Sequence, residues 1–163
     1  QYAPHVIPQL IAPIQAGACD AVFGSRMIVP GAAIAGGMPR WKYLANIGLT
    51  RFENLCLGLH LTEYHSGFRA YSRNVLESVP YELNSDGFVF DTEIIVQLSV
   101  RKFRIKEIPI ATRYFKEASS VGFVGSVRYG LAIVRTMARY GATRIGLSRS
   151  HQFRRAPVME HKT

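Results

Sequence analysis

The stretch DAVFGSR, residues 20–26, decides the fold. Ala21 to Gly24 form a short run of small and apolar residues, which is typical of a buried strand. The run ends in Ser25 and Arg26, so the end of the predicted strand carries polar groups. Ligands of α/β sheets gather beyond the carboxyl ends of strands, so we expect a binding site where this strand ends.

Two helical patterns flank this strand, and a loop separates it from the second of them. Residues 6–17 show helix-like spacing of apolar residues and stop at a glycine. Residues 27–39 are rich in Gly, Ala and Pro without a period, which predicts a mobile loop of the length that often forms a lid. Residues 39–58 predict a long helix that starts near a proline and ends at a glycine. Its expected apolar face consists of Trp41, Leu44, Ala45, Leu49, Phe52, Leu55 and Cys56.

The second half of the chain alternates helical and extended patterns. Residues 74–79 and 90–102 predict helices, and residues 103–115 alternate in a way that suits strands broken by Pro109. Alternating strands and helices predict an α/β fold.

Composition limits the classes to which the chain can belong. Its 163 residues, 48% hydrophobic and 19% charged, suit about one globular domain. No apolar run approaches the roughly 20 residues needed to cross a bilayer. Cys19 and Cys56 lie far apart among apolar neighbours, which favours buried thiols in a reducing compartment over a disulfide. The net charge of +9 predicts an anionic partner: nucleic acid, anionic lipid or a phosphorylated substrate.

The segment 121–147 predicts a basic, amphipathic helix. Two stripes run along it, an apolar one of Phe123, Val127, Leu131, Val134 and Ala138 and a basic one of Arg128, Arg135 and Arg139. Such a helix can lie on an anionic membrane surface, or it can pack its apolar stripe on the domain core with the arginines in water. Residues 148–163 hold few apolar anchors and are expected to form a flexible tail.

The order of five motifs resembles a known family: DAVFGSR, PRWKYLAN, SGFRAYSR, GFVFDTEI and IKEIPIATRYF. It is similar to the C-terminal part of the family 2 glycosyltransferases, most of all the dolichol- and polyprenol-phosphate mannosyltransferases. The resemblance implies an incomplete GT-A fold over residues 1–120, a Rossmann-like fold of nucleotide-diphospho-sugar transferases. Since the chain opens on Gln1 rather than Met, we expect the nucleotide-binding half to lie upstream and this fragment alone to be inactive.

The reaction that this resemblance implies is the inverting transfer of a hexose, with mannose from GDP-mannose as the first expectation, to a polyprenyl or dolichyl phosphate. It implies Mg2+ or Mn2+ held by an acidic motif whose last residue corresponds to Gln1, an oxygen donor suited to hard cations. Because its acceptor lives in a bilayer, the protein is expected at the cytoplasmic face of the membrane, as a peripheral protein.

The resemblance also assigns cationic and polar residues to substrate binding. Arg26, with Ser25 beside it, is expected at the acceptor phosphate, where Lys42 and Asn46 would complete the clamp and Arg40 competes with Lys42. In a separate segment, Arg113 corresponds to an arginine near the donor diphosphate. A surface arginine at a strand end, or a charge on a helix surface, is the alternative for each cation.

Three acids are the catalytic candidates. Glu93 corresponds to an acid near the family's site and is preferred to Asp91, which lies two residues away and cannot face the same way on a helix. The alternative is that the preferred acid only stabilises a helix N-terminus. Glu63 corresponds to the acid that precedes the SGFRA motif.

Within EYHSGFRAYSR, residues 63–73, the resemblance implies a wall of the transferase site. Ser66 and Gly67 are expected to approach the substrate closely, and Arg69 to brace acids such as Glu63 or Glu93. His65 stands at a variable position and is expected to be a surface or hydrogen-bonded histidine.

Two other functions remain open from the sequence. A related transferase could use UDP-glucose or UDP-N-acetylglucosamine, because donor selectivity resides largely in the expected upstream half. A basic, non-enzymatic nucleic-acid-binding module would also suit the charge. Against it, no helix-turn-helix or zinc pattern is visible in the sequence and the aromatic residues do not alternate with the basic ones, so we expect no nucleic-acid partner.

Overall fold

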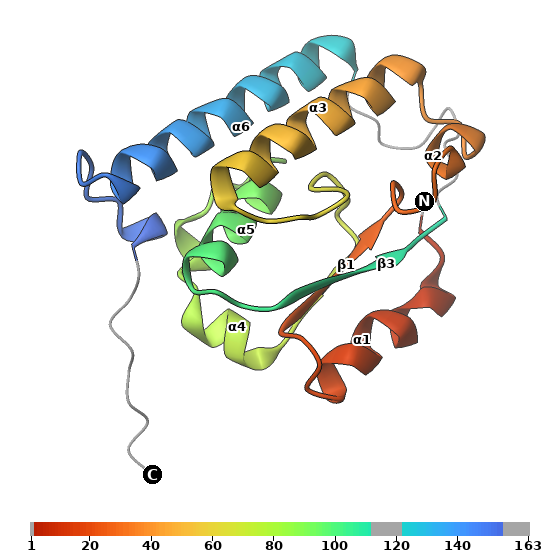
Figure 1. Cartoon of the computed structure of the whole chain (residues 1–163), viewed down its shortest axis with the longest axis horizontal. Helices are drawn as coiled ribbons and strands as arrows, with labels where there is room; N and C mark the ends of the chain where they lie inside the picture. The colour runs from red at the N-terminus through yellow and green to blue at the C-terminus, as the bar shows by residue number, and fades with distance from the viewer. Residues whose placement is uncertain (1, 112–121, 155–163) are drawn as a thin grey trace.

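A small mixed sheet forms the centre of the fold, as the computed structural model shows (Figure 1). The structure describes residues 2–111 and 122–154. The central strand β1 (Ala21–Ser25) pairs antiparallel with β2 (Arg69–Tyr71) and parallel with β3 (Ile105–Pro109). The predicted α/β class and the first strand are therefore confirmed.

Helices cover both faces of this sheet. One face carries α1 (Ile7–Gln15), and the other carries α3 (Arg40–Leu57), α5 (Phe90–Val100) and α6 (Phe123–Arg144) (Figure 1). The short elements are η1 (Pro4–Val6), α2 (Ala32–Ala35), α4 (Arg73–Ser78), η2 (Tyr81–Leu83) and η3 (His151–Phe153).

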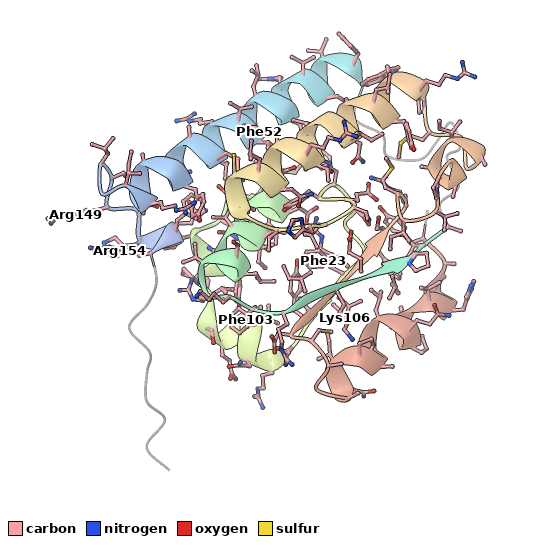
Figure 2. All side chains as sticks on the ribbon, in the orientation of Figure 1. Phe23, Phe52, Phe103, Lys106, Arg149 and Arg154 are labelled. Atoms are coloured by element: carbon pink, nitrogen blue, oxygen red, sulfur yellow. The ribbon has the colours of Figure 1, made fainter. Side chains whose placement is uncertain are left out.

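Alternation along the strands divides the interior into two cores. Phe23 points from β1 toward α3 and α5 and joins the larger core, which also contains Tyr64 and Ile95 (Figure 2). Val22 points to the opposite face and packs with Leu10 of α1 in the smaller core. The period of two in β1 thus buries every side chain of the strand.

Three local predictions differ from the structure. The segment 27–39 contains the short helix α2, so it is not wholly a loop. Residues 69–71 form β2, which was not predicted, because three residues give too short a pattern. The expected flexible tail from residue 148 is wrong for its first part, since η3 forms there and Phe153 is buried against Tyr140.

Helix α3 has the predicted ends, but only part of the predicted apolar face is buried. Pro39 precedes it, and Gly58 ends it with φ +66°, a left-handed conformation that favours glycine. Its buried side chains are Asn46, Thr50, Glu53 and Leu57. Three of the four are polar, so α3 contacts the interior through hydrogen bonds as well as apolar packing. Of the predicted face, Leu49, Phe52 and Cys56 pack partly buried on the larger core, while Trp41, Leu44 and Leu55 are exposed.

Helix α6 lies beside α3 and runs in the same direction, with Phe123 packed edge-on against Trp41 at the start of both helices (Figure 1). Its buried residues are Ile133, Thr136 and Met137. The predicted apolar stripe therefore does not pack on the core: Phe123, Val127, Leu131, Val134 and Ala138 are exposed. No helix within the described ranges is long and apolar enough to span a bilayer.

Candidate functional site

The candidate site begins where β1 ends. Ser25 and Arg26 are both buried, and the Ser25 hydroxyl lies 2.6 Å from the Thr62 hydroxyl. The backbone N–H of Met27 donates to the same Ser25 oxygen at 3.1 Å. Because β1 and β3 are parallel, their carboxyl ends meet at this edge of the sheet.

Arg26 is held by Glu63 through three donors. Its backbone N–H donates to Glu63 Oε2 at 2.8 Å, its Nε donates to Oε1 at 2.8 Å, and its Nη2 donates to Oε1 as well. Nη2 also reaches the carbonyl of His65 at 3.1 Å. Only 9% of the Arg26 side chain is exposed, and none of Glu63. Arg26 is therefore not a solvated strand-end arginine, and the carboxylate of Glu63 orients its guanidinium.

Asn46 joins this pair from α3. Its Nδ2 donates to Glu63 Oε1 at 2.8 Å, and its Oδ1 accepts from the Thr50 hydroxyl at 3.2 Å. The side chain expected in the phosphate clamp is thus a buried partner of the clamp's carboxylate.

Lys42 lies one helical turn before Asn46 and is half-buried. Burial lowers the pKa of Lys42, and the positive charge of nearby Arg26 lowers it further. Arg40, at the first position of α3, is exposed. Lys42 therefore lies close to the guanidinium of Arg26, and Arg40 is exposed at the start of the helix.

Glu107, which was not among the predicted residues, fixes the backbone beside this centre. Its carboxylate accepts from Thr62 N at 2.7 Å, from the Thr62 hydroxyl at 2.8 Å and from Glu63 N at 3.1 Å. Burial raises the pKa of Glu107, while these hydrogen bonds act in the opposite direction. An acid in the middle of a predicted strand, between Lys106 and Ile108, was the sequence signal that could have identified it.

The side chain of Arg69 is buried and holds the backbone of the motif 63–73 in place. Its Nε donates to Ser66 O at 2.7 Å, its Nη1 donates to Asp91 O at 3.0 Å, and its guanidinium stacks on the Phe23 ring at 4.7 Å. Its ion pair is with the Asp91 carboxylate at 3.3 Å, rather than with Glu63 or Glu93 as expected. With 3% of its side chain exposed, it braces the interior of the motif.

Ser66 and Gly67 lie next to this arginine. The buried Ser66 hydroxyl accepts from Phe68 N at 3.3 Å and so caps the local turn. A Cβ added at Gly67 would have its nearest neighbour, Asp91 Oδ2, at 3.9 Å. Gly67 therefore borders Asp91 without crowding against it.

His65 connects the site to a buried acid that the sequence did not single out. Its Nε2 lies 3.0 Å from Glu53 Oε2 and its Nδ1 lies 3.3 Å from Asn46 Oδ1. Glu53, with no exposed surface, also accepts from the Thr92 hydroxyl at 3.0 Å. The spacing of Asn46, Thr50 and Glu53 on one face of α3 was the signal for this polar stripe.

The two acids of α5 point in different directions. Asp91 keeps 31% of its side chain exposed beside Gly67 and Arg69, and burial raises its pKa, an effect that Arg69 and His65 oppose. Glu93 is buried, accepts from the N–H and hydroxyl of Ser85 at 2.7 and 2.8 Å, and lies 3.8 Å from Arg139. Asp91 is therefore the acid that borders the motif 63–73. Glu93 instead connects α5 to Ser85 and to Arg139 of α6.

Two predicted residues, Gln1 and Arg113, lie outside the described residues. Within residues 2–111 and 122–154, no group of three or more His, Cys, Asp and Glu could hold a metal ion. The described residues therefore do not form the metal site that the resemblance implies.

The arrangement is suited to binding an anion. Two cations, Arg26 and Lys42, lie near one another at the end of the central strand, and one carboxylate orients the first of them. Guanidinium and ammonium donors held in this way bind phosphate oxygens through charge-assisted hydrogen bonds.

No family model matches the chain. It is 30% identical over 122 residues to the UDP-N-acetylglucosamine–dolichyl-phosphate N-acetylglucosaminyltransferase of Methanococcus voltae, covering 75% of this chain and 48% of that protein. It is 29% identical over 140 residues to the undecaprenyl-phosphate mannosyltransferase of Micrococcus luteus, covering 80% and 56%. The polyprenol monophosphomannose synthase of Mycolicibacterium smegmatis is 30% identical over 110 residues, covering 67% and 40%.

The chain thus spans about half the length of these relatives. The names of these relatives all describe sugar transfer. Three similar proteins, those from Methanococcus voltae and Micrococcus luteus and the dolichyl-phosphate hexose transferase of Haloferax volcanii, are named for dolichyl or undecaprenyl phosphate. Over the matched residues, this chain belongs to the family of the dolichyl- and polyprenyl-phosphate glycosyltransferases.

Proposed function

We propose that the whole protein containing this chain transfers a hexose from a nucleotide sugar to a polyprenyl or dolichyl phosphate. The observation that carries this proposal is the pair of cations, Arg26 and Lys42, at the polar end of β1. The names of the relatives from Micrococcus luteus and Mycolicibacterium smegmatis, which refer to undecaprenyl phosphate and polyprenol, support the class of acceptor.

The proposed chemistry explains why the site has cations and no dedicated base. A phosphate oxygen of the acceptor forms the bond to the anomeric carbon, the bond from that carbon to the diphosphate breaks, and the nucleoside diphosphate leaves. The acceptor is already an anion, so no proton must be removed from it. Cations that hold the acceptor phosphate in line with the sugar would accelerate the inverting transfer by positioning and by charge stabilisation.

The proposed donor is GDP-mannose, and UDP-N-acetylglucosamine is the second candidate. The mannosyltransferase relatives favour the first, and the relative from Methanococcus voltae favours the second. UDP-glucose remains a third possibility for a transferase of this family. A transfer assay with the full-length protein, each donor and a prenyl phosphate tests the proposal. A sugar–phosphate–lipid product supports it, and hydrolysis of the donor without a lipid product contradicts it.

Dependence on Mg2+ or Mn2+ is part of the proposal for the whole protein. The ligands would include residues other than those that the structure describes, so no step is assigned to the ion here. Bound to a donor diphosphate, such an ion would neutralise charge on the leaving group.

A membrane surface is the proposed docking partner, because the neighbouring helices α3 and α6 both expose apolar side chains and α6 also exposes basic ones. The exposed apolar residues are Trp41, Leu44, Leu55, Phe123, Val124, Val127, Leu131 and Val134. Arg128 and Arg135 lie among them, and the one acid within the two helices, Glu53, is buried. Apolar side chains beside uncompensated positive charge suit the headgroup region of an anionic bilayer.

The membrane partner and the nucleic-acid alternative predict different responses. We expect the protein to bind vesicles that contain phosphatidylglycerol and to lose this binding by about tenfold when Leu131 and Val134 are both replaced by Ser, since apolar area is removed. Binding to duplex DNA should stay weak at 0.15 M salt. Tight DNA binding together with unchanged vesicle binding by the double variant would contradict the membrane proposal. Vesicle flotation and a fluorescence titration measure the two.

We expect the affinity for phosphate to fall at alkaline pH, because Lys42 loses its charge there. An ordinary lysine has a pKa of about 10.4. The pKa of Lys42 is lowered by burial and by the charge of Arg26, so Lys42 loses its proton at a lower pH than an ordinary lysine does. As the pH rises through this lowered pKa, affinity for inorganic phosphate should fall, and binding should take up protons. Calorimetry in buffers of different ionisation enthalpy measures both. In Lys42→Arg, which stays charged, the fall should disappear; an unchanged pH profile would contradict the role of Lys42.

The two acids of α5 should separate in function. Asp91→Asn is expected to slow transfer about 10–100-fold with little loss of stability, because Arg69 keeps its carbonyl acceptors. Glu93→Gln is the matched variant two residues away. It should lower the thermal midpoint by several degrees, because it weakens the contacts to Ser85 and Arg139, and should change kcat less. The reverse pattern would restore Glu93 as the functional acid.

A further inference from the structure

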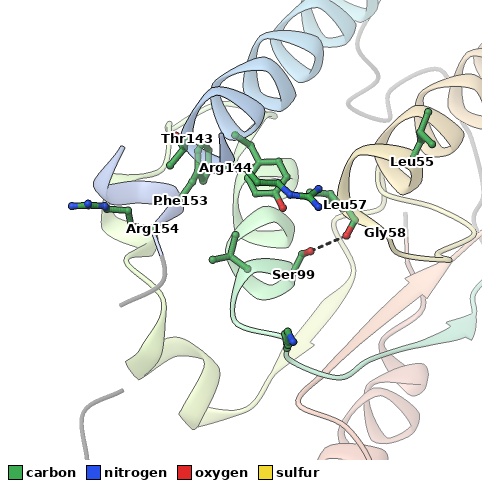
Figure 3. A pocket seen from close by; sticks show the side chains of 11 residues that line it. Leu55, Leu57, Gly58, Ser99, Thr143, Arg144, Phe153 and Arg154 are labelled. Atoms are coloured by element: carbon green, nitrogen blue, oxygen red, sulfur yellow. Dashed lines mark hydrogen bonds between the residues drawn. The ribbon is translucent and has the colours of Figure 1, made fainter. Parts of the chain in front are cut away.

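A cavity of about 710 Å3 lies at the opposite end of α3 from the site described above (Figure 3). The C-terminal ends of α3, α5 and α6 surround it, together with η3. Lys42 and Leu57 are fifteen residues apart on one helix, so at 1.5 Å per residue the cavity lies about 22 Å from the cations of the candidate site. It is therefore a separate place on the molecule, within the size range of small-ligand pockets.

The lining of this cavity combines an apolar wall with positive charge. Leu55, Val100 and Tyr140 contribute apolar surface, together with the largely buried Leu57 and Phe153, and Lys102, Arg144 and Arg154 contribute cations. Arg144 reaches from α6 toward Leu57 and Gly58 (Figure 3). None of the lining residues is acidic, and none of the three cations has an ion-pair partner among the described residues.

Lys102 has a backbone conformation that favours glycine. It is the only non-glycine residue with positive φ in the described ranges, at +58°, and it follows Arg101, the C-cap residue of α5. Its N–H donates to Ser99 O at 3.0 Å and the next N–H donates to Leu98 O at 3.1 Å, which is the hydrogen-bond pattern of a helix ending that usually has glycine at this position. A lysine here is strained, yet it brings an ammonium group to the cavity.

We propose that this cavity binds an anionic phospholipid, with the headgroup phosphate between Arg144 and Lys102 and the start of the lipid tails on the apolar wall. The absence of an acid in the lining selects an anion, and the apolar wall selects an amphiphile over a free phosphate. Leu55 and Leu147, which are 84% and 81% exposed, extend the apolar surface near the ends of α3 and α6. The site would be distinct from the acceptor site, and its occupation does not rest on the proposed transferase activity.

Calorimetric titration with dihexanoyl phosphatidylglycerol below its critical micelle concentration tests the proposal without a vesicle surface. We expect saturable binding, at least tenfold tighter than for dihexanoyl phosphatidylcholine or for glycerol phosphate. Arg144→Gln should weaken binding about tenfold, as expected for the loss of a hydrogen bond to a charged group. The control is Arg73→Gln, which changes an exposed arginine of α4 outside the cavity and should leave the affinity unchanged.

Lys102→Gly separates binding from folding. Relief of the left-handed strain should raise Tm by about 2–4 °C, while affinity for the lipid falls several-fold. A variant that is more stable and binds less tightly cannot owe its weaker binding to unfolding. Equal affinities for the two short-chain lipids, an equal loss in Arg73→Gln, or unchanged affinity in both cavity variants would overturn the proposal. Equally tight binding of glycerol phosphate would make the cavity a site for free phosphate and overturn the lipid assignment.

Discussion

Replacing Arg26 by Ala should lower the free energy of unfolding by about 3–5 kcal/mol and slow transfer by the whole protein about 10²–10³-fold. The first effect arises because Glu63 has no exposed surface and would keep a carboxylate in the interior without its cation. The second arises because the proposed clamp would lose its oriented guanidinium. Urea unfolding and the transfer assay measure the two.

The double variant Arg26→Met/Glu63→Met separates these effects. Replacing both members of a buried ion pair by apolar side chains is often close to neutral, so most of the lost stability should return. Transfer should not return, since neither methionine binds phosphate. Arg26→Lys is the charge-preserving control, and it should lose the fork that meets both Glu63 and a phosphate. Wild-type transfer by the double variant would disprove the clamp.

Replacing Gly24 by Val should destabilise the protein by about 3 kcal/mol, at the upper end for an overpacked core. A Cβ at this position would lie 2.8 and 2.9 Å from the Ile110 side chain and 3.1 Å from the carbonyl of Phe68. Neither neighbour can give way easily. Ile110 is buried, and the Phe68 carbonyl accepts the Gly24 N–H at 2.8 Å. The effect can be measured as a shift of the urea midpoint.

The matched control for this variant is Gly48→Ala in the middle of α3. No atom lies within 4 Å of a Cβ at Gly48, so the helix should gain about 0.5–1 kcal/mol. Shortening the neighbour with Ile110→Ala in a Gly24→Ala background should recover part of the stability that Gly24→Ala alone loses. If Gly24→Ala were as stable as the wild type, close packing at the end of β1 would not be the reason for a glycine there.

The elements of the fold could be predicted where local signals mark their ends. Pro39 and Gly58 bracket α3, and the apolar run of residues 21–24 is β1. The same reasoning found only part of the buried face of α3, because hydrophobic periodicity assumes that the apolar side is the buried side. Here the interior contains Glu63 and His65, which require polar partners, so a polar stripe of α3 turns inward.

The candidate site was only partly accessible from the sequence, for a related reason. Arg26, Lys42, Asn46 and Glu63 were all singled out, and the structure brings them together. That Asn46 would contact the carboxylate depends on contacts between residues 17 positions apart, which no local pattern encodes. Glu107, 44 positions from Glu63, was missed because only the pairing of β3 with β1 brings it there.

The polar stripe of α3 fixes the rotation of that helix about its own axis. An apolar stripe could turn by a fraction of a turn and exchange one leucine for another at little cost. Asn46 donates to Glu63 and Glu53 accepts from Thr92, both outside the helix, so a similar turn would break both hydrogen bonds at once. Helix α3 is therefore fixed in one rotational position. A partner that contacts its outer face at Leu44 or Leu55 meets a helix whose orientation is already set by hydrogen bonds to the buried carboxylates.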